Sequence, residues 1–320
     1  MKKCLILFIL LLIKFCAIAQ GCSDAGFCTM GAMKPDQPFN KKLNIKLRSI
    51  DFSQYYGVTH FNNHIFVSTI EANIGIGAKY TVQAKIPYQI ANGHLGTFQS
   101  LSDISLSVTR NILSTENFDV NVTLGTKIPS NNGDKQQIAG LSLPMYYQTS
   151  LGTYDLIFGA SMVSRKWLFA AGYQQALNKN QNGFWWGEWQ TDRPQDFNYI
   201  QQYAQSNLLQ RGKDVMLRVE RNFRLSRFNA SIGLLPIYRL TQDIVSIPSP
   251  VSPDNPSLNT VKNSAGSDGL ALSGIYTFGY HFNVQSGIKL LLGNKFIQRE
   301  KNPDGLSREF VTSFTYSYRF

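Results

Sequence analysis

The last segment of the chain alternates two kinds of side chain with a period of two residues. Polar residues such as Ser313, Thr315 and Arg319 occupy one set of positions. The other set is aromatic apart from one threonine: Phe310, Thr312, Phe314, Tyr316, Tyr318 and Phe320. Such alternation is typical of a β-strand whose two faces meet different surroundings. A face this rich in aromatic rings indicates contact with lipid, as in a transmembrane β-barrel.

The chain also ends on an aromatic residue of that face. Phe320, preceded by Tyr316 and Tyr318, is similar to the C-terminal signal that the outer-membrane assembly machinery reads. We therefore expect outer-membrane lipid and the barrel assembly machinery as partners of this chain.

The first nineteen residues have the three parts of a secretory signal peptide. Lys2 and Lys3 precede the apolar run Leu5–Ile13, and small residues lead to Ala19. The apolar run is shorter than the roughly 20 residues that a membrane-spanning helix needs. The sequence thus predicts a signal peptide over 1–19, an N-terminal periplasmic or plug segment over 20–42, and an outer-membrane barrel over 43–320.

Two cysteines, Cys22 and Cys28, remain after removal of the leader. In an oxidising compartment, two thiols this close, with Gly26 between them, are expected to form a local disulfide. A metal site would lack its other ligands. A lipidated Cys22 is the third interpretation, but residues 19–21 lack the leucine-like side chain of a lipobox.

Charge and hydropathy exclude two other classes of protein. The net charge of +11 falls to +8 when Lys2, Lys3 and Lys14 leave with the leader, and the remaining basic residues are scattered singly among acids. This pattern argues against nucleic-acid binding. Beyond the leader, polar or charged residues recur every few positions, which excludes helical membrane spans.

Alternation recurs along the whole chain and predicts an all-β fold, a transmembrane antiparallel β-barrel of about twelve strands. Short turns are expected near Gly77, Thr115, Arg165, Leu225 and Asn283. Strands are expected near 43–52, 70–76, 82–88, 104–108, 118–124, 154–164, 166–177, 213–223, 227–240, 268–282, 283–293 and 308–320. Long connections are expected at 53–65, 90–100, 130–153, 178–212, 241–267 and 294–307. Short periplasmic turns and long extracellular loops are the pattern of outer-membrane barrels.

Two of the long connections have distinctive sequences. The first contains Phe184, Trp185, Trp186 and Trp189, followed by helical spacing of apolar residues within 197–204. These aromatic rings are candidates for contact with a solute, or for packing of the loop itself. The second contains four prolines between 248 and 256, which predicts an irregular external loop.

Several segments together resemble one known family. The motifs lie in Ile74–Pro87, Leu101–Leu106, Leu124–Ser130, Leu151–Gly159 and Trp167–Gln174. In this order, over roughly residues 65–320, they resemble the outer-membrane proteins grouped as meta-pathway phenol-degradation-associated transporters. Those proteins are similar in barrel type to long-chain fatty-acid channels. The sequence departs from the pattern at Ser102, where a glycine is usual, and before Gly152, where the Pro-Gly loop is shorter.

The resemblance implies a small hydrophobic or aromatic solute. The predicted function is therefore an outer-membrane channel for passive uptake or export of such molecules. The alternative is a non-conducting structural or adhesive barrel that acts through its extracellular loops.

The alternation also assigns a set of charged residues to the lumen. A charge facing lipid would cost about 2–4 kcal/mol near the membrane centre, so water is the favoured side. These side chains either pair across the lumen and fill it, or form a selectivity constriction. The residues are Glu71, Lys85, Asp103, Asp119, Lys127, Asp155, Arg218, Glu220 and Lys289.

Enzyme chemistry is not expected. Barrel hydrolases need a histidine beside a serine at the outer rim, whereas His60, His64 and His94 lie in predicted loops and His281 lies near a periplasmic turn. His60 and His64 have no carboxylate or thiol nearby in sequence, so a metal site is not expected either. No cofactor is predicted.

Overall fold

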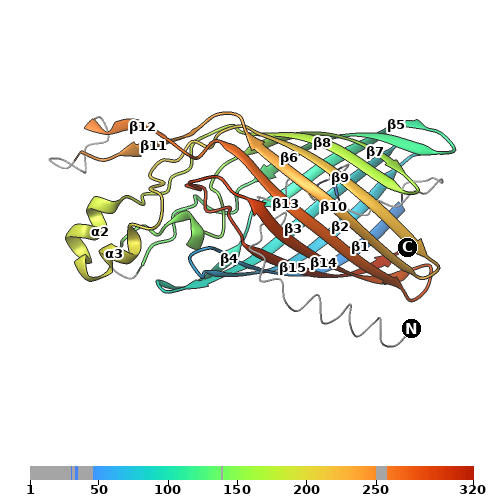
Figure 1. Ribbon diagram of the computed structural model, residues 1–320, viewed down its shortest axis with the longest axis horizontal. Coiled ribbons are helices and arrows are strands. Elements are labelled where there is room, and N and C mark those ends of the chain that lie inside the picture. The colour runs from blue at the N-terminus through green and yellow to red at the C-terminus, as the bar shows by residue number, and fades with distance from the viewer. Residues whose placement is uncertain (1–29, 31–32, 35–45, 138–139, 250–257) are drawn as a thin grey trace.

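The chain forms a closed antiparallel β-barrel (Figure 1), seen in a computed structural model that describes Met30, Met33, Lys34 and residues 46–137, 140–249 and 258–320. Twelve strands make the wall. They are β1 (Lys46–Val58), β2 (His64–Ile76), β3 (Tyr80–Gly93), β5 (Ile104–Ser114), β6 (Phe118–Ile128), β7 (Asp155–Ser164), β8 (Trp167–Ala176), β9 (Asp214–Leu225), β10 (Phe228–Arg239), β13 (Gly269–His281), β14 (Ser286–Ile297) and β15 (Phe310–Arg319).

Each strand pairs with its neighbours in chain order, and the first strand pairs with the last. This pairing runs from Ser49 opposite Arg319 to Val58 opposite Phe310. A short strand, β4 (Gly96–Leu101), continues the line of β5 beyond Ser102, because β3 pairs with β4 along one half and with β5 along the other. The wall is therefore complete, without a free end between β1 and β15.

Side chains alternate across the wall as the sequence predicts. In β6, Val122 and Leu124 are exposed on the outside, whereas Thr123 and Lys127 are buried inside. In β15, the aromatic set from Phe310 to Phe320 points outward, and Val311 and Thr315 point inward. The predicted alternation is confirmed. Its physical reason is that water and lipid lie on opposite sides of each strand.

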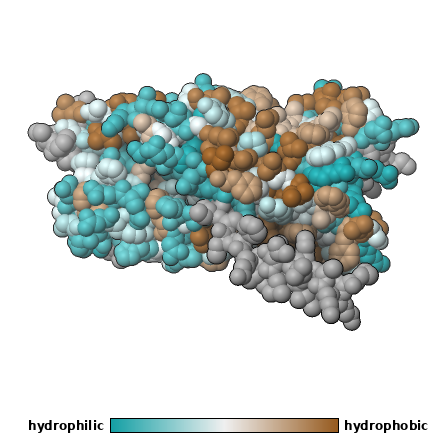
Figure 2. All heavy atoms as spheres, in the orientation of Figure 1, coloured by the Kyte–Doolittle hydropathy of each residue, from teal (hydrophilic) through white to brown (hydrophobic). Residues whose placement is uncertain are grey.

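The outward apolar residues form a belt around the barrel. Figure 2 shows hydrophobic residues gathered over the strands, while the end that carries α2 and α3 is mostly hydrophilic. A belt of exposed Phe, Leu, Ile and Val side chains is stable in lipid and unfavourable in water. The chain is thus a barrel of the outer membrane of Gram-negative bacteria.

The long connections gather at one end of the barrel (Figure 1), which is the extracellular end by the rule for these proteins. They carry the hairpin β11 (Asp243–Ile247) and β12 (Thr260–Ser264), the helices α2 (Trp186–Asp192) and α3 (Phe197–Ile200), and the 3-10 turns Met145–Tyr147 and Pro194–Asp196. We call the described parts of 129–154, 177–213, 240–268 and 298–309 the cap. No helix in the described residues is long and apolar enough to cross a membrane.

Several predicted boundaries are wrong at this end. β1 reaches Val58 and pairs with β2 from His64, so residues 53–58 are strand and not loop. Residues 90–100 form the β3–β4 hairpin, and β14 continues to Ile297. The proline-rich connection contains the β11–β12 pair, which the sequence did not predict. The expected helix is shorter, Phe197–Ile200, and α2 was missed.

The described part of the N-terminal segment lies inside the barrel. Met30 and Met33 are buried against side chains of the wall, including Ile157, Met216 and Ile275. Cys22 and Cys28 lie outside the described residues, so their disulfide stays a prediction, as does the signal peptide.

Candidate functional site: the interior of the barrel

One side of the lumen is filled by the two methionines. Gly125 and Gly159 face inward, and a Cβ atom on either glycine would collide with Met30 or Met33 respectively. The absence of side chains there leaves room for the methionines to lie against β6 and β7. The guanidinium of Arg218 donates a hydrogen bond of 2.8 Å to the carbonyl of Met33. On this side of the barrel, the two methionines thus occupy part of the lumen.

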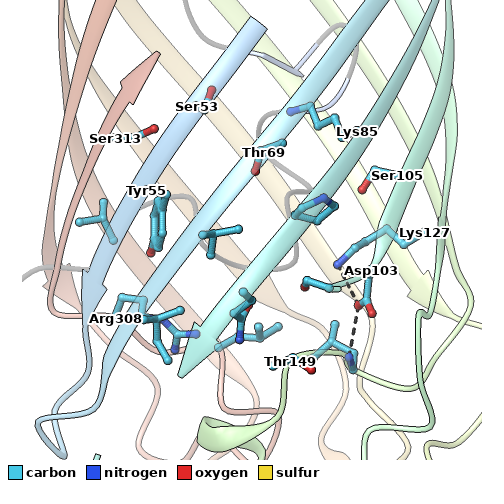
Figure 3. Close-up of a pocket in the computed structure, with 18 of the residues that line it drawn as sticks. Ser53, Tyr55, Thr69, Lys85, Asp103, Ser105, Lys127, Thr149, Arg308 and Ser313 are labelled. Carbon is cyan, nitrogen blue, oxygen red and sulfur yellow. Dashed lines mark hydrogen bonds and ion pairs between the residues drawn. The ribbon is translucent and has the colours of Figure 1, made fainter. Parts of the chain in front are cut away.

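The other side keeps a cavity of about 230 Å³ between β1, β2, β3, β5, β14 and β15 (Figure 3). Its roof is made by the cap, through Met145 to Leu151 and Asp304 to Arg308. Apolar side chains such as Tyr55, Ile65, Leu291 and Val311 line it together with serines, threonines and charged groups. A mixed wall of this kind fits a small, partly apolar molecule.

Four of the charged side chains that line the cavity form a cluster, which we call the central cluster. Lys34 Nζ lies 2.8 Å from Asp51 Oδ2 and also contacts Glu71 Oε1. Lys85 Nζ lies 3.3 Å from Glu71 Oε2, and the amide of Gln83 donates to the same carboxylate over 2.7 Å. Because the two lysines balance the two acids, the central cluster carries no net charge.

The other predicted lumen charges are also placed inside the wall. Lys127 Nζ lies 3.4 Å from Asp103 Oδ2. A dashed line marks this contact in Figure 3. Arg218 and Glu220 form a fully buried pair with 2.8 Å between Nε and Oε1. Lys289 lines the cavity. Asp119 lies apart from these groups, at the periplasmic end of β6, where it accepts a hydrogen bond from Ser114.

Asp155 belongs to a second network at the extracellular end, which we call the rim cluster. It consists of Asp155, Asp214, Asp243, Asp304, Arg211, Arg239 and Arg299. Arg239 alone contacts three acids, with its nitrogens 2.8 Å from Asp214 Oδ1, 2.8 Å from Asp243 Oδ2 and 2.7 Å from Asp304 Oδ2. These contacts join the ends of β9 and β10 to two cap connections.

The four residues of the aromatic loop lie in the cap, away from the cavity. Phe184 and Trp189 are fully buried in the cap, against Leu141, Tyr147 and Tyr203. The indole Nε1 of Trp189 donates to the Ser142 carbonyl over 2.9 Å. Trp185 and Trp186 are half-buried. All four residues are described, and none of them lines the cavity.

Sequence reasoning missed the residues that roof the cavity. Met145, Gln148, Thr149, Ser150 and Leu151 come from a connection without periodicity. Arg308 precedes β15 and was not singled out. The family motif Leu151–Gly159 begins at the end of this connection, but no feature of one sequence shows which loop folds over the lumen.

The histidines make local contacts. His60 lies 3.0 Å from Glu309, and His64 Nδ1 lies 2.9 Å from the Tyr56 hydroxyl. Among the described residues, no group of three or more His, Cys, Asp or Glu side chains has the arrangement of a metal site.

Comparison with solved structures supports the fold. The chain is similar to the COG4313 outer-membrane channel of Pseudomonas putida F1, with 11% identity, 89% of this chain and 99% of that chain covered, and a TM-score of 0.59. The likeness to the NanC porin is weaker, with 12% identity, 85% of this chain and 98% of that chain covered, and a TM-score of 0.45. The likeness to the CymD monoaromatic hydrocarbon channel has 10% identity, 95% of this chain and 94% of that chain covered, and a TM-score of 0.41.

No protein-family model matches the sequence. No curated protein matches it either. The class that the fold defines is therefore the outer-membrane β-barrel, and the comparison with the COG4313 channel shows the same architecture at low identity.

Proposed function

We propose that this protein is a passive outer-membrane channel for small hydrophobic or aromatic molecules. The observation that carries the proposal is the cavity inside the barrel, which lies between the cap and the central cluster and has apolar side chains in its wall. A barrel that served only as a scaffold would gain stability by filling this space. The resemblance of Leu124–Ser130 and Leu151–Gly159 to the meta-pathway transporters points to the same class of solute.

The alternative is a sealed barrel that acts through its outer surface. The packed aromatic core of the cap and the rim cluster favour this alternative, because both hold the connections over the lumen. A sealed barrel and a channel differ in conductance and in solute flux.

The test is reconstitution into planar bilayers and liposomes. We expect ion conductance and swelling with small aromatic and aliphatic solutes. The double variant Met30→Ala and Met33→Ala should increase conductance, because both side chains occupy the lumen. Met162→Ala is the matched control, since Met162 is 40% exposed on the outer face. Zero conductance for the wild type and for the double variant, with folded barrels confirmed, would support the sealed alternative.

A further inference from the structure

The charges around the cavity are not evenly matched. Five basic side chains line it, Lys34, Lys85, Lys127, Lys289 and Arg308, against the four acids Asp51, Glu71, Asp103 and Asp304. Among the described residues, each carboxylate of the lining thus already has a cation beside it.

Among the described residues, no carboxylate lies within ion-pair distance of Arg308. Arg308 is 5% exposed. Its Nη1 donates to two backbone carbonyls, over 2.6 Å to Gly305 and 3.0 Å to Ser307. Its buried Nε has no hydrogen-bond acceptor among the described residues. A buried guanidinium is costly without an anion, so its position calls for one.

The two acids nearest to Arg308 in the sequence, Glu309 and Asp304, form no ion pair with it. Glu309 Oε1 lies 3.0 Å from His60 Nδ1. Asp304 lies within ion-pair distance of Arg239, Arg211 and Arg299, at 2.7, 3.6 and 3.9 Å. Burial alone would raise the pKa of Asp304, but these three guanidinium groups hold it well below its usual range. Asp304 thus stays ionised and is fully engaged on the side of the rim cluster.

The conformation of the connection fixes where the guanidinium lies. Gly305 has a φ of +67°, and a Cβ atom there would overlap the backbone of Met145 and Tyr146. The turn is therefore held against the other roof segment, and the Gly305 carbonyl holds Nη1 of Arg308 in place. Figure 3 shows Arg308 among the lining side chains, with Tyr55 and Ser313 also on the cavity wall.

Apolar surface lies beside this charge. Leu306 and Val311, which flank Arg308 in sequence, line the same cavity, as do Leu151 and Leu291. A cation next to an apolar wall recognises a molecule with one anionic end and one apolar end. A neutral hydrocarbon would fit the wall but would leave the guanidinium without a counter-charge.

We propose that the cavity binds small apolar solutes that carry one carboxylate, with Arg308 as the residue that holds the carboxylate. The inference rests on the proposed channel function and narrows its solute class. It makes Arg308 a specificity-determining residue for acids over neutral molecules of the same shape.

Benzoate and benzamide are suitable probes, because they differ in charge and hardly in shape. Binding to the purified full-length barrel in detergent is measured by calorimetry at pH 7.5, with detergent-only blanks. We expect benzoate to bind about tenfold more tightly than benzamide, which is the effect of one charge-assisted hydrogen bond. Arg308→Gln should remove this preference and leave benzamide binding unchanged. Arg308→Lys should keep part of the preference, because the charge remains.

Arg224→Gln is the matched control, since it removes one positive charge from the exposed periplasmic end of β9. It should leave the preference for benzoate intact. Equal binding of benzoate and benzamide by the wild type, or a preference that survives Arg308→Gln, would overturn the inference. Ion conductance without a preference for benzoate would keep the proposed channel and remove only its carboxylate specificity. If Arg308→Gln fails to fold, the wild-type comparison and Arg308→Lys still decide the question.

Discussion

Single glycines control how closely segments of the cap approach one another. Gly152 has a φ of +70°, and a Cβ atom there would overlap the carbonyl oxygen of Asn132. The site combines a backbone conformation that L-residues rarely adopt with a close approach of a second segment. No other residue type fits both conditions, which explains why the Leu151–Gly159 motif contains a glycine at this point.

We predict that Gly152→Ala destabilises the folded barrel by about 1–3 kcal/mol, because the alanine adds both strain and a backbone clash. The measurement is the temperature at which the folded form on a semi-native gel is half lost. Gly77→Ala is the control: its φ is +59°, but nothing lies within 4 Å of the added Cβ. If Gly152→Ala and Gly77→Ala lowered this temperature by a similar amount, the effect would come from backbone strain alone.

The sequence predicted individual site residues only in part. Alternation placed Glu71, Lys85 and Asp103 on the inner face, because each strand has a fixed period of two. It did not indicate that Lys34 would join Glu71, since that contact crosses 37 residues without a periodic signal. Arg308 lies outside any strand, so alternation does not place it. Its role depends on which acids form ion pairs with the other arginines.

At the scale of elements, the cap behaves as a small domain with its own core. Trp189 is fully buried and lies in one cluster with Leu143, Tyr147 and Ile200. The sequence predicted either contact with a solute or packing of the loop for the tryptophans, because a single loop sequence does not reveal its packing partners. Strand ends were also misjudged, because beyond the lipid both faces of a strand meet water and alternation fades, as at Gln54 in β1.

We predict that Trp189→Ala loosens the cap while the barrel stays folded. Removal of a buried tryptophan leaves a void that costs about 3–5 kcal/mol. Limited proteolysis should then cut within 178–212, and ion conductance should rise. Trp167→Ala is the control, since Trp167 is 41% exposed on the outer face. Resistance to protease equal to that of the wild type would contradict a packing role for Trp189.

The cap should also respond to pH through α2. Partial burial, with Asp192 and Asp134 nearby, raises the pKa of Glu188 to about 6, from 4.5 in the unfolded chain. Because the folded-state pKa is the higher one, the stabilising effect of the protonated form is full below pH 4.5 and is lost as the pH rises through 6. Amide hydrogen exchange in 186–203 should thus be slower at pH 4.5 than at pH 7.5, after correction for intrinsic rates.

Glu188→Gln removes the titrating group and should make the corrected exchange independent of pH over this interval. Glu116→Gln is the control, since Glu116 is exposed in a periplasmic turn. If Glu188→Gln retained the full pH dependence, another group would be responsible.

At the scale of the whole molecule, the architecture was the most predictable feature. Lipid outside and water inside impose one rule on every strand, so twelve strands and five tight turns could be found from a single sequence. The residues that fill the lumen could not be found from a single sequence, because their position depends on contacts between the N-terminal residues and distant parts of the wall.

We predict heat-modifiable migration for the purified protein, because a closed barrel satisfies its backbone hydrogen bonds and resists detergent until it is boiled. Deletion of Phe320 should lower the amount of the fast-migrating folded form in outer membranes. It removes the terminal aromatic ring and the hydrogen bond from Phe320 N to Arg48 O. Conversion of Phe320 to Tyr, which keeps a ring, is the control. Full assembly of the deletion would show that the last residue is dispensable.

The pairing of β1 with β15 has a consequence for the order of assembly. Every other wall contact joins strands that are neighbours along the chain, whereas Ser53 and Thr315 meet across 262 residues. Local hairpins form early because their loop-closure entropy is small, and the most distant pairing comes last. Met30 and Met33, which precede β1 in the chain, must therefore either enter while the sheet is still open or thread a finished ring. Entry before closure needs no threading, so the wall would form around the methionines that fill it.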